Sequence, residues 1–185
     1  MTRIIAGLAG GTVLEVPGSG TRPTSDRVRE SLFGALDAAD ELRGARVADL
    51  YAGSGALGLE AVSRGAASLD LVERSAGAAA AAQRNASRVA RAMGGDIDVR
   101  VHRAAVDAFL AGSHGPYDVV FLDPPYDLPD DDLGAALSAL APVMAPGGLA
   151  VVERASHSPQ PALHAFELER HRRYGDTALW WLRAT

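Results

Sequence analysis

The chain has 185 residues, of which 48% are hydrophobic and 22% charged, and its formal net charge is −5. This length and apolar content are typical of one folded domain and exclude a disordered chain. There is no cysteine, which excludes disulfides, thiolate nucleophiles, iron–sulfur clusters and zinc fingers. The five histidines never fall into a metal-ligand spacing, so we expect no metal site.

The negative net charge argues against non-specific coating of nucleic acid but leaves room for a local basic face. All 18 basic residues are arginines, whose planar donor group suits phosphates. A simpler explanation for the use of arginine in place of lysine is the base composition of the genome, which the high alanine and glycine content also indicates. No run of 18 apolar residues occurs, and residues 1–12 lack the apolar core of a signal peptide, so we expect a cytoplasmic protein without membrane contact.

The N-terminal part of the chain predicts a small hairpin followed by a helix. Two short apolar runs, 3–7 and 12–16, are separated by a glycine-containing turn, so we expect a β-hairpin extension over residues 1–21. The main domain then covers 22–185. Its first helix is expected to be capped by Thr24 or Ser25 and to end at Gly44.

From residue 46 onward the apolar pattern alternates between strands and helices. Strands separated by helices predict a parallel sheet with right-handed crossovers, and a closing hairpin near residue 175 adds antiparallel strands, which makes the sheet mixed. The expected strands are 46–51, 68–73, 97–102, 117–123 and 147–154, and the expected helices are 56–65, 75–95, 106–111 and 131–141.

A glycine-rich loop directly follows the first strand of this alternation. Gly53, Gly55 and Gly58 match the G-x-G-x-x-G pattern between a strand and a helix, and Glu73 ends the next strand 20 residues after the first glycine. Such a loop approaches a nucleotide closely, and the acid accepts hydrogen bonds from ribose hydroxyls. These residues alone leave NAD, FAD and S-adenosylmethionine open. Asp49, four residues before the loop, favours S-adenosylmethionine, because a carboxylate there suits the cationic amino acid part of that cofactor.

The most apolar strand ends at the sequence Asp123-Pro124-Pro125-Tyr126. The two prolines stop the strand and leave backbone carbonyls free to accept hydrogen bonds. Methylation of an exocyclic amino nitrogen needs this set. Acceptors on both N–H bonds direct the lone pair toward the methyl group, and the tyrosine ring stacks on the base.

With these motifs, the chain resembles class I S-adenosylmethionine-dependent amino-methyltransferases, and within them the RsmD family of bacterial 16S ribosomal RNA guanine-N2 methyltransferases. The resemblance extends over nearly the whole chain, and R-P-T-S-D-R-V-R-E-S-L-F at 22–33 is its most specific part. It implies a Rossmann-like, seven-stranded, mostly parallel sheet with a C-terminal antiparallel hairpin. It also implies that the substrate is 16S ribosomal RNA in the small subunit or its assembly intermediate, and that the enzyme is a monomer.

The resemblance implies a site residue by residue. Expected to bind the cofactor are Asp49, Tyr51, Gly53, Ser54, Gly55, Gly58, Glu73, Arg74, Ala105, Val106 and Asp123. The target amine is expected at Asp123, Pro124, Pro125 and Tyr126, and the RNA at Arg3, Arg22, Thr24, Arg27 and Tyr126. The chain departs from many relatives at Ala105, where they carry Asp or Asn. Adenine contacts would then come from the backbone of Ala105 and from packing against Val106.

Three other functions stay open at this point. An NAD-dependent oxidoreductase explains the glycines and Glu73 but leaves the Asp123–Tyr126 corner without a role. An amino-methyltransferase acting on DNA adenine or protein glutamine uses a similar corner, but usually carries an additional recognition domain. A non-catalytic RNA-binding protein that kept the fold would not need every motif residue in place.

Overall fold

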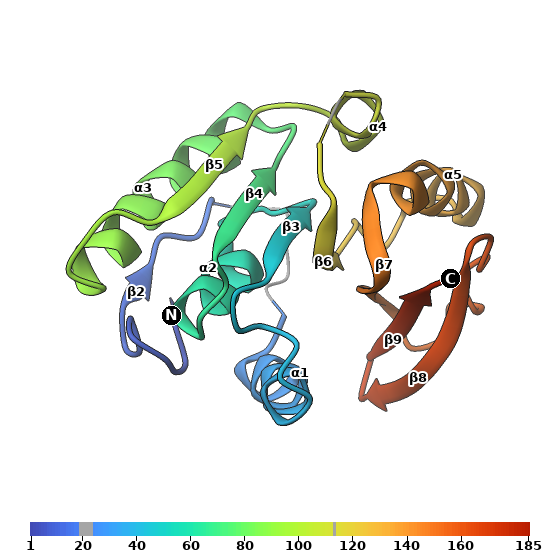
Figure 1. The fold of residues 1–185 in the computed structure, drawn as a ribbon, viewed down its shortest axis with the longest axis horizontal. Helices are drawn as coiled ribbons and strands as arrows, with labels where there is room; N and C mark the ends of the chain where they lie inside the picture. The colour runs from blue at the N-terminus through green and yellow to red at the C-terminus, as the bar shows by residue number, and fades with distance from the viewer. Residues whose placement is uncertain (19–23, 113) are drawn as a thin grey trace.

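The computed structural model describes residues 1–18, 24–112 and 114–185, and its elements follow the predicted alternation (Figure 1). The strands are β1 (Thr2–Arg3), β2 (Val13–Leu14), β3 (Arg46–Leu50), β4 (Ser68–Val72), β5 (Asp98–His102), β6 (Tyr117–Leu122), β7 (Met144–Ala155), β8 (Phe166–Tyr174) and β9 (Thr177–Ala184). The helices are α1 (Asp26–Ala38), α2 (Ala56–Ser63), α3 (Ala76–Ala92), α4 (Val106–Leu110) and α5 (Asp130–Leu140), with a short 3₁₀ turn at Ala141–Val143.

Seven of the strands form one mixed sheet in the order β5-β4-β3-β6-β7-β9-β8. The pairs from β5 to β7 are parallel, and β9 pairs antiparallel with both β7 and β8. The predicted mixed sheet with a closing C-terminal hairpin is therefore confirmed. After β5 the chain crosses to the other side of β3, so β3 and β6 flank the point where the strand order reverses.

Helices cover both faces of the sheet and enclose two apolar cores (Figure 1). Helices α1, α2 and α3 pack on one face, where Val47, Phe121 and Trp181 point. Helices α4 and α5 pack on the other face against Ala48 and Leu122. Burial on both faces explains why the central strands are almost entirely apolar, since a side chain on either face enters a core.

The N-terminal hairpin exists but is much shorter than predicted, because only Thr2–Arg3 and Val13–Leu14 pair. Some of the residues between them donate their backbone N–H groups to α2, while Ile4, Gly11 and Thr12 donate within the hairpin. Ile5 and Ala6 donate to the Glu60 carboxylate at 2.7 and 3.0 Å. Leu14 and Ile4 are buried in the larger core, so residues 1–18 pack as part of the main domain.

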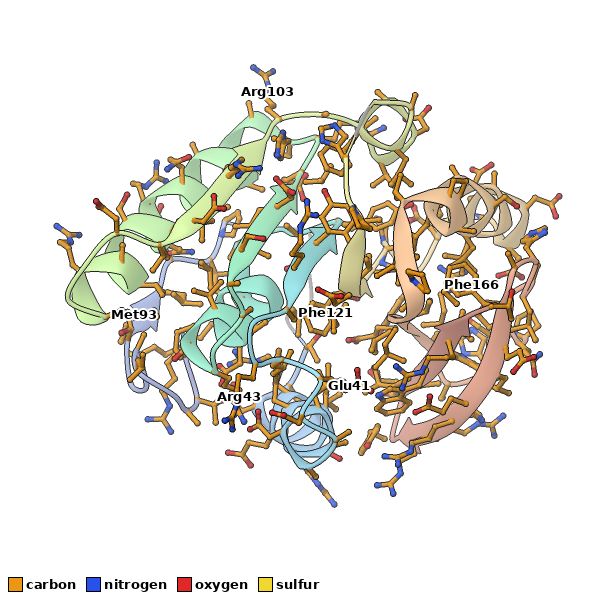
Figure 2. All side chains as sticks on the ribbon, in the orientation of Figure 1. Glu41, Arg43, Met93, Arg103, Phe121 and Phe166 are labelled. Carbon is orange, nitrogen blue, oxygen red and sulfur yellow. The ribbon has the colours of Figure 1, made fainter. Side chains whose placement is uncertain are left out.

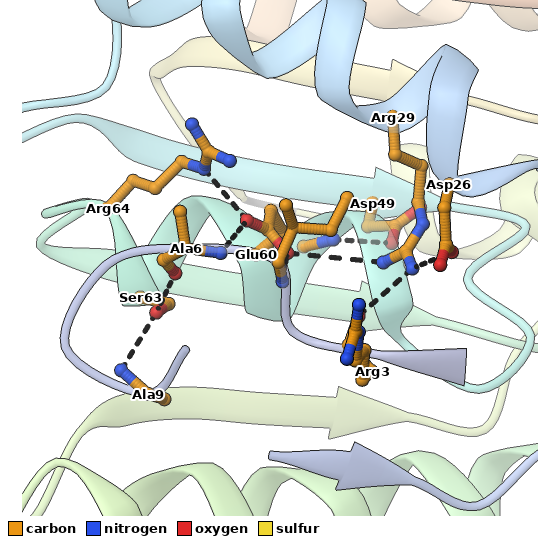
Figure 3. A network of polar contacts seen from close by, with 11 residues as sticks. Arg3, Ala6, Ala9, Asp26, Arg29, Asp49, Glu60, Ser63 and Arg64 are labelled. Carbon is orange, nitrogen blue, oxygen red and sulfur yellow. Dashed lines mark hydrogen bonds and ion pairs between the residues drawn. The ribbon is translucent and has the colours of Figure 1, made fainter. Parts of the chain in front are cut away.

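Glu60 is the centre of this attachment (Figure 3). Its side chain is fully buried, and it also accepts a hydrogen bond from Arg64 at 2.8 Å. The Arg29 guanidinium, 1% exposed, lies 3.9 Å from Glu60 and donates to the carbonyl of Arg3 and the carboxylate of Asp26. The network therefore joins the N-terminal segment, α1 and α2 through buried charges.

The first helix begins as expected and ends earlier. The Ser25 hydroxyl accepts a hydrogen bond from the backbone of Val28, which is an N-cap. The expected end at Gly44 is wrong, because α1 stops at Ala38. Asp40 adopts a positive φ of 53° there, and the Glu41 backbone donates back to the carbonyl of Leu36. The predicted boundary at residue 21 lies in residues 19–23, outside the described part.

Candidate functional site

Most of the predicted cofactor and target residues meet at the carboxyl edge of the parallel strands. β3 carries Asp49, and the glycine loop follows it. Glu73 follows β4, Ala105 comes three residues after β5, and Asp123 follows β6. Ligands of open α/β sheets bind where the strand order reverses, here between β3 and β6. The topology therefore brings the two predicted motifs, 70 residues apart in the chain, to neighbouring strands.

The glycine loop turns tightly between β3 and α2. Tyr51, Gly53 and Gly55 all have positive φ, at 68°, 55° and 82°, and Gly55 is the N-cap of α2. Gly58 has another purpose. A side chain there would meet Leu69 and Leu71 at less than 3 Å, so its glycine lets α2 pack closely on β4.

Glu73 is clamped to the loop by two backbone donors. One carboxylate oxygen accepts from Gly53 at 2.9 Å, and the other accepts from Ser75 at 2.7 Å. The backbone of Ala104 donates to the Glu73 carbonyl, which places the start of α4 beside the same residue. A carboxylate oxygen has two lone pairs, so both oxygens keep capacity to accept from a ligand hydroxyl.

Asp49 is 1% exposed and accepts a hydrogen bond from the backbone of Gly58 at 2.9 Å. Burial, together with the nearby charge of Glu73, raises the pKa of Asp49 to about 7, and the Gly58 hydrogen bond opposes the rise. Burial makes the ionised form of this carboxylate unfavourable, and a cationic ligand beside it would stabilise that form. Asp49 therefore favours a positive charge beside the glycine loop.

Asp123 forms a second acidic centre together with Glu153, the antepenultimate residue of β7. The Thr24 hydroxyl lies 2.7 Å from a Glu153 oxygen and 3.2 Å from an Asp123 oxygen. Desolvation and the charges of Glu153 and Asp49 raise the pKa of Asp123 well above its usual range. Burial also raises the pKa of Glu153, against hydrogen bonds from Thr24 and Tyr126.

The corner after β6 is held by Arg154. This buried guanidinium donates to the carbonyls of Pro125 and Leu128, at 3.3 and 2.8 Å, and pairs with Asp130 at 3.1 Å. Its neighbour Glu153 points to the opposite face of β7, as successive strand residues do. Arg154 thus fixes the turn that carries the predicted target site.

A hollow of ≈190 Å³ opens beside this corner. Its walls come from the start of α1, the turn after β6, the end of β7 and the β8–β9 hairpin: Thr24, Ser25, Val28, Tyr126, Glu153, Tyr174, Gly175, Asp176 and Thr177. The Tyr126 ring is 44% exposed, and its hydroxyl lies 3.1 Å from that of Thr177. A neighbouring hollow is lined by Arg27 and Arg173.

The predicted RNA-contact residues are only partly brought together. Thr24 contacts Asp123 directly, and exposed Arg27 lines the adjoining hollow. Arg3 lies instead near Asp26 at the N-terminal segment, where the hydrogen bond from Arg29 and, to a smaller extent, the charge of Arg3 lower the pKa of that carboxyl. Arg22 lies outside the described residues. Figure 2, with all described side chains drawn, shows Arg103 projecting from the end of β5, an exposed arginine that the motifs do not single out.

The sequence analysis missed Glu153, Arg154 and Asn85. Glu153 carries a signal that could have found it, because it follows an apolar run as Asp49, Glu73 and Asp123 do. Asn85 on α3 is fully buried, and its amide donates to the carbonyl of Ser54 in the glycine loop. No comparable pattern marks Asn85 in an alanine-rich helix.

Within the described ranges, no group of three or more His, Cys, Asp or Glu side chains has a metal-binding arrangement. None of the helices described is both long and apolar enough to cross a membrane.

Comparison with known proteins places this chain in a family. A family model described as "Conserved hypothetical protein 95" matches residues 2–183. The chain is 44% identical to "Ribosomal RNA small subunit methyltransferase D" of Escherichia coli K12 over 125 residues, which are 67% of this chain and 60% of that protein. The matched region thus spans less than two thirds of that relative.

Solved structures show the same fold. A hypothetical protein of Thermus thermophilus is 33% identical with a TM-score of 0.81, and the match covers 98% of both chains. The magnesium protoporphyrin IX methyltransferase of Synechocystis is 19% identical with a TM-score of 0.69, covering 91% of this chain and 87% of that one, which supports the fold alone. The protein therefore has the class I methyltransferase fold and belongs to the family of conserved hypothetical protein 95, the RsmD family that its motifs resemble.

Proposed function

We propose that this protein transfers a methyl group from S-adenosylmethionine to the exocyclic N2 of a guanine in 16S ribosomal RNA. The observation that carries the proposal is the meeting of the glycine loop, Glu73 and the Asp123–Tyr126 corner at the reversal point of the sheet. Family membership supports it, since relatives are named ribosomal RNA small subunit methyltransferase D.

The negative charges beside the glycine loop favour this cofactor over a dinucleotide. Asp49 is buried at the loop, and its raised pKa reflects the cost of holding a negative charge there. A pyrophosphate would add negative charge beside the carboxylates of Asp49 and Glu73. The positive charges of a sulfonium and an ammonium group would instead compensate the negative charges of these carboxylates. The donor set fits S-adenosylmethionine: Glu73 for the ribose, Asp49 for the cationic part, and the apolar start of α4 at Val106 for the adenine.

The chain's own residues would position the target nitrogen. The bound cofactor supplies an electrophilic methyl group on sulfur, which keeps the electron pair of the broken C–S bond as the N–C bond forms. Asp123 and the carbonyl of Pro124 would accept hydrogen bonds from the two N–H groups of the target amine. These two hydrogen bonds would direct the lone pair of the nitrogen toward the methyl group. The nitrogen then passes one proton to the Asp123 carboxylate that accepts its hydrogen bond. That proton becomes acidic only as the new N–C bond forms, so no strong base is needed beforehand.

Tyr126, which is 44% exposed beside the target corner, would stack on the flipped base. Because the net charge is −5, affinity for RNA cannot come from phosphates alone. We therefore propose that a small ribosomal subunit or its assembly intermediate, rather than free RNA, is the substrate. We also propose that the enzyme acts in the cytoplasm as a monomer.

A methyl-transfer assay tests the function. Radiolabelled S-adenosylmethionine is offered with protein-free 16S RNA, partly assembled small-subunit particles, and DNA, and the product nucleosides are separated. We expect labelled N2-methylguanosine from the particles. Labelled methyladenine from DNA would replace the proposal by a DNA methyltransferase, and NADH binding without S-adenosylmethionine binding by an oxidoreductase.

Replacing Glu73 by alanine should weaken S-adenosylmethionine binding by about 1.5–3 kcal/mol, because hydrogen bonds to a charged acceptor are lost. Isothermal titration calorimetry measures this change in affinity. Glu167→Ala, an exposed carboxylate on β8, is the matched control and should bind as the wild type does. Equal affinity in the Glu73 variant would show that the clamp on Gly53 serves only the loop.

A further inference from the structure

Glu153 is a buried carboxylate that the proposed methyl transfer leaves without a role. It is 5% exposed, yet it lines the hollow beside the target corner. Its hydrogen-bond partner Thr24 also reaches Asp123, so both carboxylates lie within reach of one hydroxyl group. Burying two carboxyl groups side by side lowers the stability of the fold. Such an arrangement is typical of a site where the two groups bind a ligand.

The hollow presents hydrogen-bond acceptors to whatever enters it. A hydroxyl has one proton to donate, and the shorter distance gives the proton of Thr24 to Glu153. Tyr126 also donates a hydrogen bond to Glu153. Because each carboxylate oxygen has two lone pairs, Glu153 and Asp123 still keep lone pairs that can accept hydrogen bonds from a ligand. The cationic neighbour Arg154 is directed to the carbonyls of Pro125 and Leu128 and does not neutralise this wall.

Two neighbouring carboxylates suit guanine and disfavour the other bases that carry an amino group. The edge of guanine presents an amino group and a ring N1–H side by side, and both are donors. In adenine and cytosine the ring nitrogen beside the amino group is an acceptor, and its lone pair would face a carboxylate. A buried acceptor without a donor costs about 1–3 kcal/mol, more when it is charged.

We propose that Glu153 selects the target base: its carboxylate accepts the ring N1–H of guanine while Asp123 accepts from the amino group. The inference rests on the proposed function and names the residue that sets its specificity. Thr24 acts as a positioning residue, because it holds Glu153 in place beside Asp123. The raised pKa of both acids is consistent with this role, because hydrogen bonds donated by the N–H groups of a bound base would stabilise their ionised forms.

The test compares guanine with 2-aminopurine at the methylated position. This analogue keeps the amino group but has no N1–H. The target nucleotide is located first with the wild type, and particles are then assembled on ligated RNA carrying either base. We expect the wild type to methylate guanine far faster. In Glu153→Gln the side-chain amide donates to the bare ring nitrogen, so the ratio of the guanine rate to the 2-aminopurine rate should fall at least about tenfold.

Three controls separate the outcomes. Glu167→Gln on β8 should keep the wild-type ratio, and thermal unfolding with S-adenosylmethionine titration checks that Glu153→Gln is folded and binds cofactor. An unchanged ratio in Glu153→Gln, even with a lower rate on both bases, overturns the inference and leaves Glu153 as an anchor for Thr24. Absence of methylguanosine with the wild type overturns the proposed function itself.

Discussion

Replacing Asp123 by alanine should lower the rate of methyl transfer about 100-fold or more, while S-adenosylmethionine affinity changes by less than a few fold. In the proposed mechanism Asp123 contacts the nucleophile, and a positioned polar group lost from the transition state has an effect of this size. Its carboxylate contacts Thr24, which also contacts Glu153, whereas the residue proposed to bind the cofactor ribose is Glu73, which is held at the glycine loop. Single-turnover rates and calorimetry measure the two effects separately.

Asp123→Asn is the matched variant, because the amide keeps one oxygen acceptor and the length of the side chain. It should retain more activity than Asp123→Ala. If the alanine variant lost cofactor affinity and rate in equal measure, Asp123 would be a structural residue. If both variants kept the wild-type rate, the corner would not hold the target amine.

Replacing Glu60 by alanine should lower the free energy of unfolding by about 3–5 kcal/mol, the usual cost of removing one partner from buried ion pairs. The substitution removes one of the two carboxylates beside the guanidinium of Arg29, which is 1% exposed, and leaves Asp26 as the other. It also removes the acceptor of two backbone N–H groups from the N-terminal segment. Urea unfolding followed by circular dichroism measures the change.

The matched control is Asp37→Ala, which removes the other partner of Arg64 at a more exposed position. Exposed ion pairs contribute about 0–1 kcal/mol, so this variant should be nearly as stable as the wild type. Equal losses in the two variants would mean that the network in Figure 3 does not stabilise the attachment of the N-terminal segment.

The motifs predicted which strand ends carry the site because each motif is local. Asp49 and the glycines occupy one continuous strand–loop–helix segment, and Asp123–Tyr126 directly ends an apolar strand. Parallel strands present their carboxyl ends at one edge, so the order of elements sufficed to expect these motifs to meet. Capping residues also predicted that α1 begins at Thr24 or Ser25, and the structure has Ser25 as the N-cap.

The N-terminal segment shows where local patterns fail. Its β-like runs predict long paired strands, but α2 offers Glu60 and Ser63 as closer partners for the same backbone groups. The helix α1 is likewise shortened at Asp40, where the chain turns so that Leu42 enters the core. In both cases contacts to distant residues outweighed the intrinsic preference of the segment.

The amino-acid sequence by itself determined the order of strands and helices, the glycine loop and the acidic strand ends, because periodicity and turn residues act over a few positions. Only the tertiary structure decided that Thr24 joins Asp123 to Glu153, residues 99 and 129 positions away from it. That contact depends on β7 lying beside β6 and on the residues just before α1 lying at their carboxyl ends. Such a placement follows from burying every apolar face at once, a condition that no short stretch of sequence records.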